Sequence, residues 1–104
     1  MVEKDVRDPS VKYAKSFGDV MHWRMHFGHG VSRGWPDDLF VFKDGHHWWV
    51  EFKRPGGEAT PLQIETHKKL GGFMADVSVI DDEEDFKVLF DRRRSRAKLN
   101  TVPQ

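Results

Sequence analysis

The sequence predicts a single α/β domain in which helical and extended segments follow one another along the chain. Three observations predict it: apolar residues recur at helical spacing, several short segments alternate apolar and polar residues, and Asp44-Gly45 separates two such segments. A chain of this length buries roughly 65% of its unfolded surface in one core. The expected domain covers residues 1–104, with a core over about 3–90 and a fraying basic tail over 91–104.

The first half of the chain begins with a helix, which is expected over residues 2–17. Pro9 predicts a break or a fresh start within it, because proline is poorly tolerated inside a helix. Gly18 is expected to end the helix. A strand then follows over Val20–Phe27, where side chains alternate between two faces.

A hairpin and a capped helix organise the second half. Leu39–Phe42 and His46–Lys53 are predicted strands joined at Asp44-Gly45, one of the strongest short-range signals for a β-hairpin. Thr60 followed by Pro61 is typical of a helix N-terminus. The remaining elements are a helix from Pro61 to about Leu70, a strand over Phe73–Ile80 and a helix over Asp82–Phe90.

The composition excludes several kinds of chemistry. The chain has no cysteine, which rules out disulfides, thiolate zinc sites and thiol nucleophiles. Its 17 basic and 17 acidic side chains cancel, so net charge alone does not indicate a nucleic-acid partner. The longest apolar run is short and the N-terminus lacks the layout of a secretion signal, which predicts a soluble, cytoplasmic protein with no membrane partner. Any bound metal is therefore expected on oxygen or imidazole ligands.

The chemically reactive side chains gather around the predicted hairpin. Asp37 and Asp38 precede its first strand, and Glu51 and Lys53 lie near the end of its second. Because side chains two apart share one face of a strand, Glu51 and Lys53 point the same way. Bulky apolar residues occupy both faces, which predicts a central strand where a carboxylate is costly unless a cation meets it. The alternative is an exposed Glu-Lys ladder in solvent.

The hairpin turn decides which aspartate lies opposite Glu51. A two-residue loop at Asp44-Gly45 pairs it with Asp38, whereas a three-residue loop with a left-handed Gly45 pairs it with Asp37. Periodicity does not choose between them. Two carboxylates about 4 Å apart repel by about 4 kcal/mol at an effective dielectric of roughly 20, which favours a bound proton or a metal. Mg²⁺ is the expected cofactor, with Mn²⁺ as a substitute, because it takes one or two carboxylates together with water and phosphate.

Three further residues each allow a structural and a chemical role. The ammonium of Lys53 is suited to stabilising an attacking water or the phosphate, or else pairs with Glu51. Gln63 completes a capping box with Thr60, and capping and active-site orientation are equal alternatives. Glu3 lies in a first helical turn, where the helix dipole favours a glutamate in any case.

These motifs together resemble one known family. They follow the order Glu3, Gly34-x-Pro36-Asp37, Glu51-x-Lys53 and Gln63. On a helix-strand-hairpin-helix frame, this order resembles the VRR-NUC family of the PD-(D/E)xK nuclease superfamily over about residues 3–90. The resemblance implies a restriction-endonuclease-like core with a mixed central sheet flanked by helices. It also implies that Asp37 and Glu51 are metal ligands, that Lys53 is catalytic, and that Glu3 and Gln63 support the site.

The resemblance also favours Asp37 in the hairpin register, and therefore a bulge or a longer turn. Asp38 then becomes a neighbour that reaches the site through water. Gly34 and Pro36 are expected to shape the loop that delivers Asp37, with Trp35 exposed near DNA. The backbone carbonyl of Phe52 is expected as a further oxygen ligand of the metal.

Short, stand-alone members of this family look like phage or bacterial enzymes, and some resemble resolvases of four-way (Holliday) junctions. We therefore expect a structure-specific DNA endonuclease of DNA repair, in a bacterial cell or a phage-infected host, that hydrolyses phosphodiester bonds by in-line attack of an activated water. The alternatives are a flap or nicking nuclease, and a module that binds DNA junctions but has lost turnover.

Contacts to DNA and to a second copy complete the expectations. The basic side chains expected on phosphates are Arg24, Arg33, Arg54 and Lys68, and the arginine-rich tail would add salt-dependent affinity. Symmetric resolution of a junction needs two coordinated cuts, which predicts a homodimer. Trp23, Phe27 and Trp35 are candidates for its interface, with ordinary core packing as the alternative.

Overall fold

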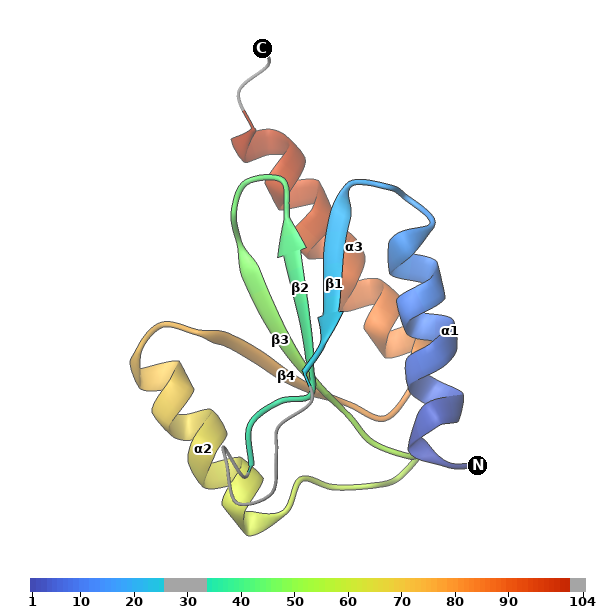
Figure 1. Cartoon of the computed structure of the whole chain (residues 1–104), viewed down its shortest axis with the longest axis vertical. Coiled ribbons are helices and arrows are strands. Elements are labelled where there is room, and N and C mark those ends of the chain that lie inside the picture. The colour runs from blue at the N-terminus through green and yellow to red at the C-terminus, as the bar shows by residue number, and fades with distance from the viewer. Residues whose placement is uncertain (26–33, 102–104) are drawn as a thin grey trace.

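The computed structural model describes residues 1–25 and 34–101. Within these residues, helices and strands follow the predicted order α-β-β-β-α-β-α (Figure 1). The strands are β1 (Val20–Arg24), β2 (Asp38–Phe42), β3 (His47–Phe52) and β4 (Asp76–Ile80). The helices are α1 (Glu3–Lys15), α2 (Pro61–Gly72) and α3 (Glu83–Asn100). The α/β class and the element order are thus confirmed, while the end of the first predicted strand, with Phe27, lies outside the described residues.

The strands form one mixed sheet in the order β1-β2-β3-β4. β1 and β2 pair antiparallel, as do β2 and β3, whereas β3 and β4 are parallel. A parallel pair needs a crossover connection, and α2 is part of the one between β3 and β4. β3 is therefore an inner strand, as expected for the strand that carries Glu51. Just beyond it, the backbone N–H of Lys53 donates to the carbonyl of Ile80 at 2.8 Å.

One face of the sheet packs against α1 and α3, which also contact each other (Figure 1). Alternation along β3 places Trp48, Val50 and Phe52 in this core and leaves Glu51 on the opposite face. Trp48 stacks on Phe86 of α3, with ring centroids 5.3 Å apart. In the described part of the chain, α2 contributes no residue to this core and contacts β4 instead. Glu51 thus lies outside this hydrophobic core.

The hairpin between β2 and β3 has the longer of the two predicted turns. Phe42 and His46 close it, with the N–H of Phe42 donating to the carbonyl of His46 at 3.0 Å. Gly45 has φ +87°, which is the left-handed conformation of a bulge. Asp38 then pairs with Val50, so the next step of this register sets Asp37 opposite Glu51. The turn chosen from the family resemblance is confirmed.

Three features of the predicted elements differ from the structure: the break at Pro9, the end of α2 and the start of β4. α1 is continuous through Pro9, although a break was expected there. The helix buries a stripe formed by Val6, Ser10 and Ala14, and the Ser10 hydroxyl donates to the Val6 carbonyl at 2.7 Å. This packing offsets the one backbone hydrogen bond that a proline removes. α2 runs past Leu70 to Gly72, and β4 begins only at Asp76, because the intervening residues form a connecting turn.

The expected basic tail is also wrong for residues 91–100, which continue α3. Arg93 donates two hydrogen bonds to Asp76, at 2.7 and 2.9 Å, and its guanidinium lies over the ring of Trp48. Arg94 pairs with Asp19 at 2.9 Å, and Ala97 is 4% exposed. The arginines looked like solvated charge in the sequence, but their partners lie elsewhere in the chain.

Among the described residues, no helix is both long enough and apolar enough to span a membrane. α3 has the length, with 18 residues, but it is too polar.

Candidate metal centre

Three carboxylates from separate elements meet near the end of β3. They belong to Glu3 at the start of α1, Asp37 just before β2, and Glu51 in β3, and one oxygen of each lies within 4.8 Å of the others. Reasoning from the residues joined an aspartate to Glu51, and the family resemblance added Glu3. The structure brings all three together. Because these segments are distant in the chain, only the tertiary fold creates the cluster.

Glu51 is the buried member of the cluster, with 1% of its surface exposed. Within the described residues, its Oε1 atom has no hydrogen-bond partner. Burial raises the pKa of Glu51 to about 8, and the negative charge of Asp37 acts in the same direction. A hydrogen bond with Asp37 and the charge of Glu3 also raise this pKa, whereas Lys53 lowers it. At neutral pH without a cation, Glu51 therefore holds a proton in much of the population.

These donors fit a hard divalent cation. All three offer carboxylate oxygens, which Mg²⁺ and Mn²⁺ prefer as ligands. A buried carboxylate oxygen without a partner is also the kind of atom that a cation satisfies. Asp37 and Glu51 would hold the ion, with Glu3 as a third carboxylate. The carbonyl of Phe52 lies between Glu51 and Lys53 along the chain, and its role as a ligand stays a prediction.

Lys53 lies beside the cluster, and a histidine lies beyond it. The positive charge of Lys53 lowers the pKa of Glu51, which is the expected effect of an ammonium near a carboxylate. Burial lowers the pKa of His67 on α2, and the charge of Lys53 lowers it further. The Nε2 atom of His67 is buried without a hydrogen-bond partner among the described residues. Because its pKa is lowered, His67 is mainly a neutral imidazole at neutral pH.

The loop that carries Asp37 packs tightly on α2. Gly34 has φ +83°, and a Cβ there would lie 2.8 Å from Thr66 Oγ1 and 2.9 Å from the carbonyl oxygen of Leu62. Glycine is thus favoured at position 34 for two reasons: the backbone adopts a left-handed conformation, and α2 lies too close for a side chain. The expected exposure of Trp35 is only partly borne out, because its half-buried ring lies edge-on to Trp49 at 6.0 Å. This contact holds the loop against the sheet.

Replacing Gly34 by alanine should destabilise the protein by about 2–4 kcal/mol, because a left-handed alanine and a clash with helix backbone add together. The loop would shift and carry Asp37 away from Glu51. Chemical denaturation measures the stability, and calorimetric titration with Mn²⁺ measures the cation site. The matched control is Gly45→Ala, where φ is +87° but no atom lies within 4 Å of the added Cβ. It should cost only about 1 kcal/mol. Equal losses in both variants would contradict the packing argument.

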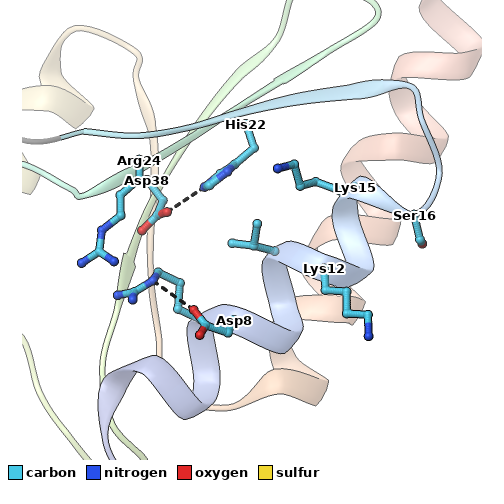
Figure 2. A pocket seen from close by; sticks show the side chains of 9 residues that line it. Asp8, Lys12, Lys15, Ser16, His22, Arg24 and Asp38 are labelled. Atoms are coloured by element: carbon cyan, nitrogen blue, oxygen red, sulfur yellow. Dashed lines mark hydrogen bonds and ion pairs between the residues drawn. The ribbon is translucent and has the colours of Figure 1, made fainter.

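Asp38 does not join the cluster. Its side chain is fully buried on the core face, where Oδ1 lies 2.7 Å from Nε2 of His22 (Figure 2). Adjacent residues of a strand point to opposite faces, so Asp37 and Asp38 are separated by the sheet. The geometry gives no support to the expected water-mediated role of Asp38 beside the metal.

The remaining predicted site residues are not members of the carboxylate cluster. Gln63 forms the predicted capping box, since its Oε1 accepts from the Thr60 N–H at 2.9 Å and its own N–H donates to Thr60 Oγ1. Across residues 1–25 and 34–101, Gln63 makes no hydrogen bond to the three carboxylates, so its support of the site stays a prediction. Arg24, Arg54 and Lys68 have exposed side chains, as phosphate contacts require. Arg33 lies outside the described residues.

Two residues near the site escaped the reasoning from sequence. Arg7 is almost fully buried, and its Nη1 lies 3.4 Å from Oε2 of Glu3. His67 shares a helix face with Gln63, one turn along α2. Both lie four positions from a residue already singled out, and this spacing is the signal that would have pointed to them. Neither position alone distinguishes a site residue from an ordinary surface pair.

Comparison with known protein families and with curated proteins finds no relative of this chain. No protein-family model matches the sequence, and none of the curated proteins is similar enough to count as related to it. The resemblance to VRR-NUC nucleases therefore rests on the residues and their arrangement alone.

Proposed function

We propose that this protein is a divalent-metal-dependent endonuclease that hydrolyses phosphodiester bonds in DNA. One observation carries the proposal: the carboxylates of Glu3, Asp37 and Glu51 converge within 4.8 Å, with Lys53 beside them. A structural cluster of like charges would be costly to keep, because one member is buried and repelled by the others. A bound cation removes this repulsion by neutralising the carboxylates, and strongly perturbed carboxylates of this kind are typical of catalytic sites.

Each residue has a role that follows from its chemistry. Asp37 and Glu51 would hold Mg²⁺ or Mn²⁺, and Glu3 would add a third carboxylate. A divalent cation in such a site supplies Lewis-acid polarisation of the phosphate and lowers the pKa of water. Lys53 is a compact positive charge that orients the attacking water or stabilises charge developing on the phosphate. His67 is near enough for the charge of Lys53 to lower its pKa, and as a neutral imidazole it adds no second positive charge to the site.

The family proposal is consistent with the fold. A restriction-endonuclease-like PD-(D/E)xK core of the VRR-NUC type would use a mixed sheet with Glu51 on an inner strand and Lys53 on the same face just beyond it. β3 is an inner strand that carries Glu51, and Lys53 is the residue directly after Phe52, where the strand ends. We extend the proposal to branched DNA, such as four-way junctions, cut by a homodimer. Support for the dimer comes from β1, an edge strand on which Met21 and Trp23 are 59% and 44% exposed. Large exposed apolar side chains on one strand favour an association surface.

The experiment is an incubation of the protein with labelled duplex, flap and four-way junction DNA, with Mg²⁺, with Mn²⁺ and with EDTA. We expect metal-dependent product, with the four-way junction cut fastest and at paired positions. Product from the flap alone would favour a flap nuclease. Binding to junctions without product in either metal would overturn the proposed chemistry and favour a DNA-binding module. A double substitution, Asp37→Asn with Glu51→Gln, provides the control for contaminating nucleases.

A further inference from the structure

A second concave surface is lined by Arg7, which also contacts Glu3 of the metal centre. It is a groove of about 650 Å³ between α1 and β1 (Figure 2). Its cationic residues are Arg7, Lys12, Lys15 and Arg24, and its acids are Asp8 and Asp38. With histidine neutral, the groove has a formal charge of +2, although the whole chain is neutral. Positive charge is therefore concentrated here rather than spread over the molecule.

Three of these cations are available to a ligand. Lys12, Lys15 and Arg24 are exposed, and within the described residues none of their side chains forms an ion pair or a hydrogen bond. Both acids, in contrast, already have partners. Asp8 lies 3.9 Å from Lys4 and 3.7 Å from Arg7, and Asp38 is bound by His22. The charge that faces outward in this groove is thus positive.

The floor of the groove is fixed by buried polar groups. Asp38 is fully buried and holds Nε2 of His22 at 2.7 Å, and the His22 side chain is 11% exposed. The His22 ring also lies against Phe40, with centroids 4.8 Å apart. The second oxygen of Asp38 is buried without a hydrogen-bond partner in the described part of the chain. Arg24 stands directly across the β1–β2 ladder from Asp38, so this carboxylate biases a flexible cation toward the groove.

Arg7 joins the groove to the metal centre. It lines the groove and also contacts Glu3, one of the three clustered carboxylates, at 3.4 Å. A ligand that passes over Arg7 would therefore run from the acidic cluster into a surface of free cations. Along α1, the distance from Arg7 to Lys15 is roughly 12 Å at 1.5 Å per residue. At about 3.4 Å of helix axis per nucleotide, this corresponds to roughly three to four nucleotides of one strand.

We propose that the α1–β1 groove binds the phosphates of one DNA strand next to the bond that is cut, with Lys12, Lys15 and Arg24 as the contacts. The inference deepens the proposed function, on which it rests for the identity of the ligand. Lysine and arginine side chains neutralise backbone phosphates without reading sequence, which suits an enzyme that recognises DNA shape. Arg24 was expected on phosphate from the sequence, whereas the two lysines become partners of Arg24 only in the folded molecule.

The test measures DNA affinity in EDTA by fluorescence anisotropy, over a series of salt concentrations, so that cleavage does not enter. The groove variant combines Lys12→Gln, Lys15→Gln and Arg24→Gln. We expect its affinity for a labelled junction to fall by roughly 10- to 100-fold near 0.1 M salt, and its salt slope to fall by about two to three. The matched control carries the same charge change at surface positions outside the groove, namely Lys43→Gln, Lys69→Gln and Lys87→Gln. The control should change affinity by less than about threefold.

The outcomes separate this inference from the proposed chemistry. Equal losses in the two triple variants, or no loss in either, would overturn the groove as the DNA surface. In that case, metal-dependent cleavage by the unaltered protein would still support the proposed nuclease function. Groove-dependent binding without cleavage in Mg²⁺ would instead support the groove and reject the nuclease. If the triple variant melts at a lower temperature, the three single variants replace it, each with an expected decrease of about one in the salt slope.

Discussion

Replacing Lys53 by alanine should slow Mg²⁺-dependent cleavage of DNA by at least about 10²- to 10³-fold while changing DNA affinity by less than about threefold. The reason is that one positive charge beside the carboxylate cluster acts on the reacting phosphate or water, where a single fixed donor contributes this much to a rate. The bulk of DNA affinity, in contrast, comes from many phosphate contacts. Single-turnover cleavage of the best substrate measures the rate, and anisotropy in EDTA measures the affinity.

The control for this substitution is Lys43→Ala, which removes an exposed lysine in the hairpin turn and should leave the rate unchanged. Lys53→Arg keeps the charge on a larger, planar group and should recover only part of the rate, because a guanidinium does not occupy the same position as a compact ammonium. A Lys53→Ala variant that cuts at the normal rate would reject the catalytic role of this residue.

Replacing Glu51 by glutamine should have two opposite effects: loss of cleavage, and a more stable metal-free protein above neutral pH. The pKa of Glu51 is about 8 in the folded protein against 4.5 for the ordinary side chain. The folded state therefore binds more protons than the unfolded state between these values, and the free energy of unfolding falls as the pH rises from about 4.5 to about 8. The two pKa values set an upper limit of about 5 kcal/mol for this loss.

Glutamine cannot ionise, so the variant should lack this part of the pH dependence and exceed the stability of the unaltered protein at pH 8. Urea denaturation in EDTA at several pH values between 4.5 and 8.5 measures the difference. Glu58→Gln, at an exposed position, is the control and should follow the unaltered protein. At pH 8, Mg²⁺ should raise the free energy of unfolding of the unaltered protein, because a bound cation takes the place of the proton that Glu51 has lost. It should not raise that of the Glu51→Gln variant, which has no carboxylate at this position. A parallel pH dependence in both proteins would contradict the buried, proton-binding Glu51.

Local signals in the sequence were sufficient for the elements around the site. Thr60 and Pro61 correctly predicted the start of α2, and Asp44-Gly45 the β2–β3 hairpin. Alternation correctly separated Glu51 from the core residues of β3. These features depend on backbone conformation and on side-chain direction, both of which act over a few residues.

Long-range partners account for what local signals misjudged. Arg93 and Arg94 belong to a packed helix because Asp76 and Asp19 lie opposite them, and no pattern within residues 91–100 records those partners. Pro9 is accepted inside α1 because the helix buries a continuous stripe against the sheet. In both places, contacts across the fold outweigh a local preference.

The sequence by itself determined the order of the elements, the inner strand that carries Glu51, and the kinds of side chain available for metal chemistry; the strand was expected to include Lys53 but ends one residue earlier, at Phe52. Reasoning from the residues left open which aspartate faces Glu51, and the family resemblance favoured Asp37 and added Glu3. Only the tertiary structure showed the three-residue turn that sets Asp37 opposite Glu51, the arrival of Glu3 from α1, and the separation of Asp38 onto the other face. The physical reason is that a strand repeats every two residues, so a change of one residue in a turn exchanges the faces without altering the pattern. Distances between separate elements are set by how the helices and the sheet pack, which no single segment encodes.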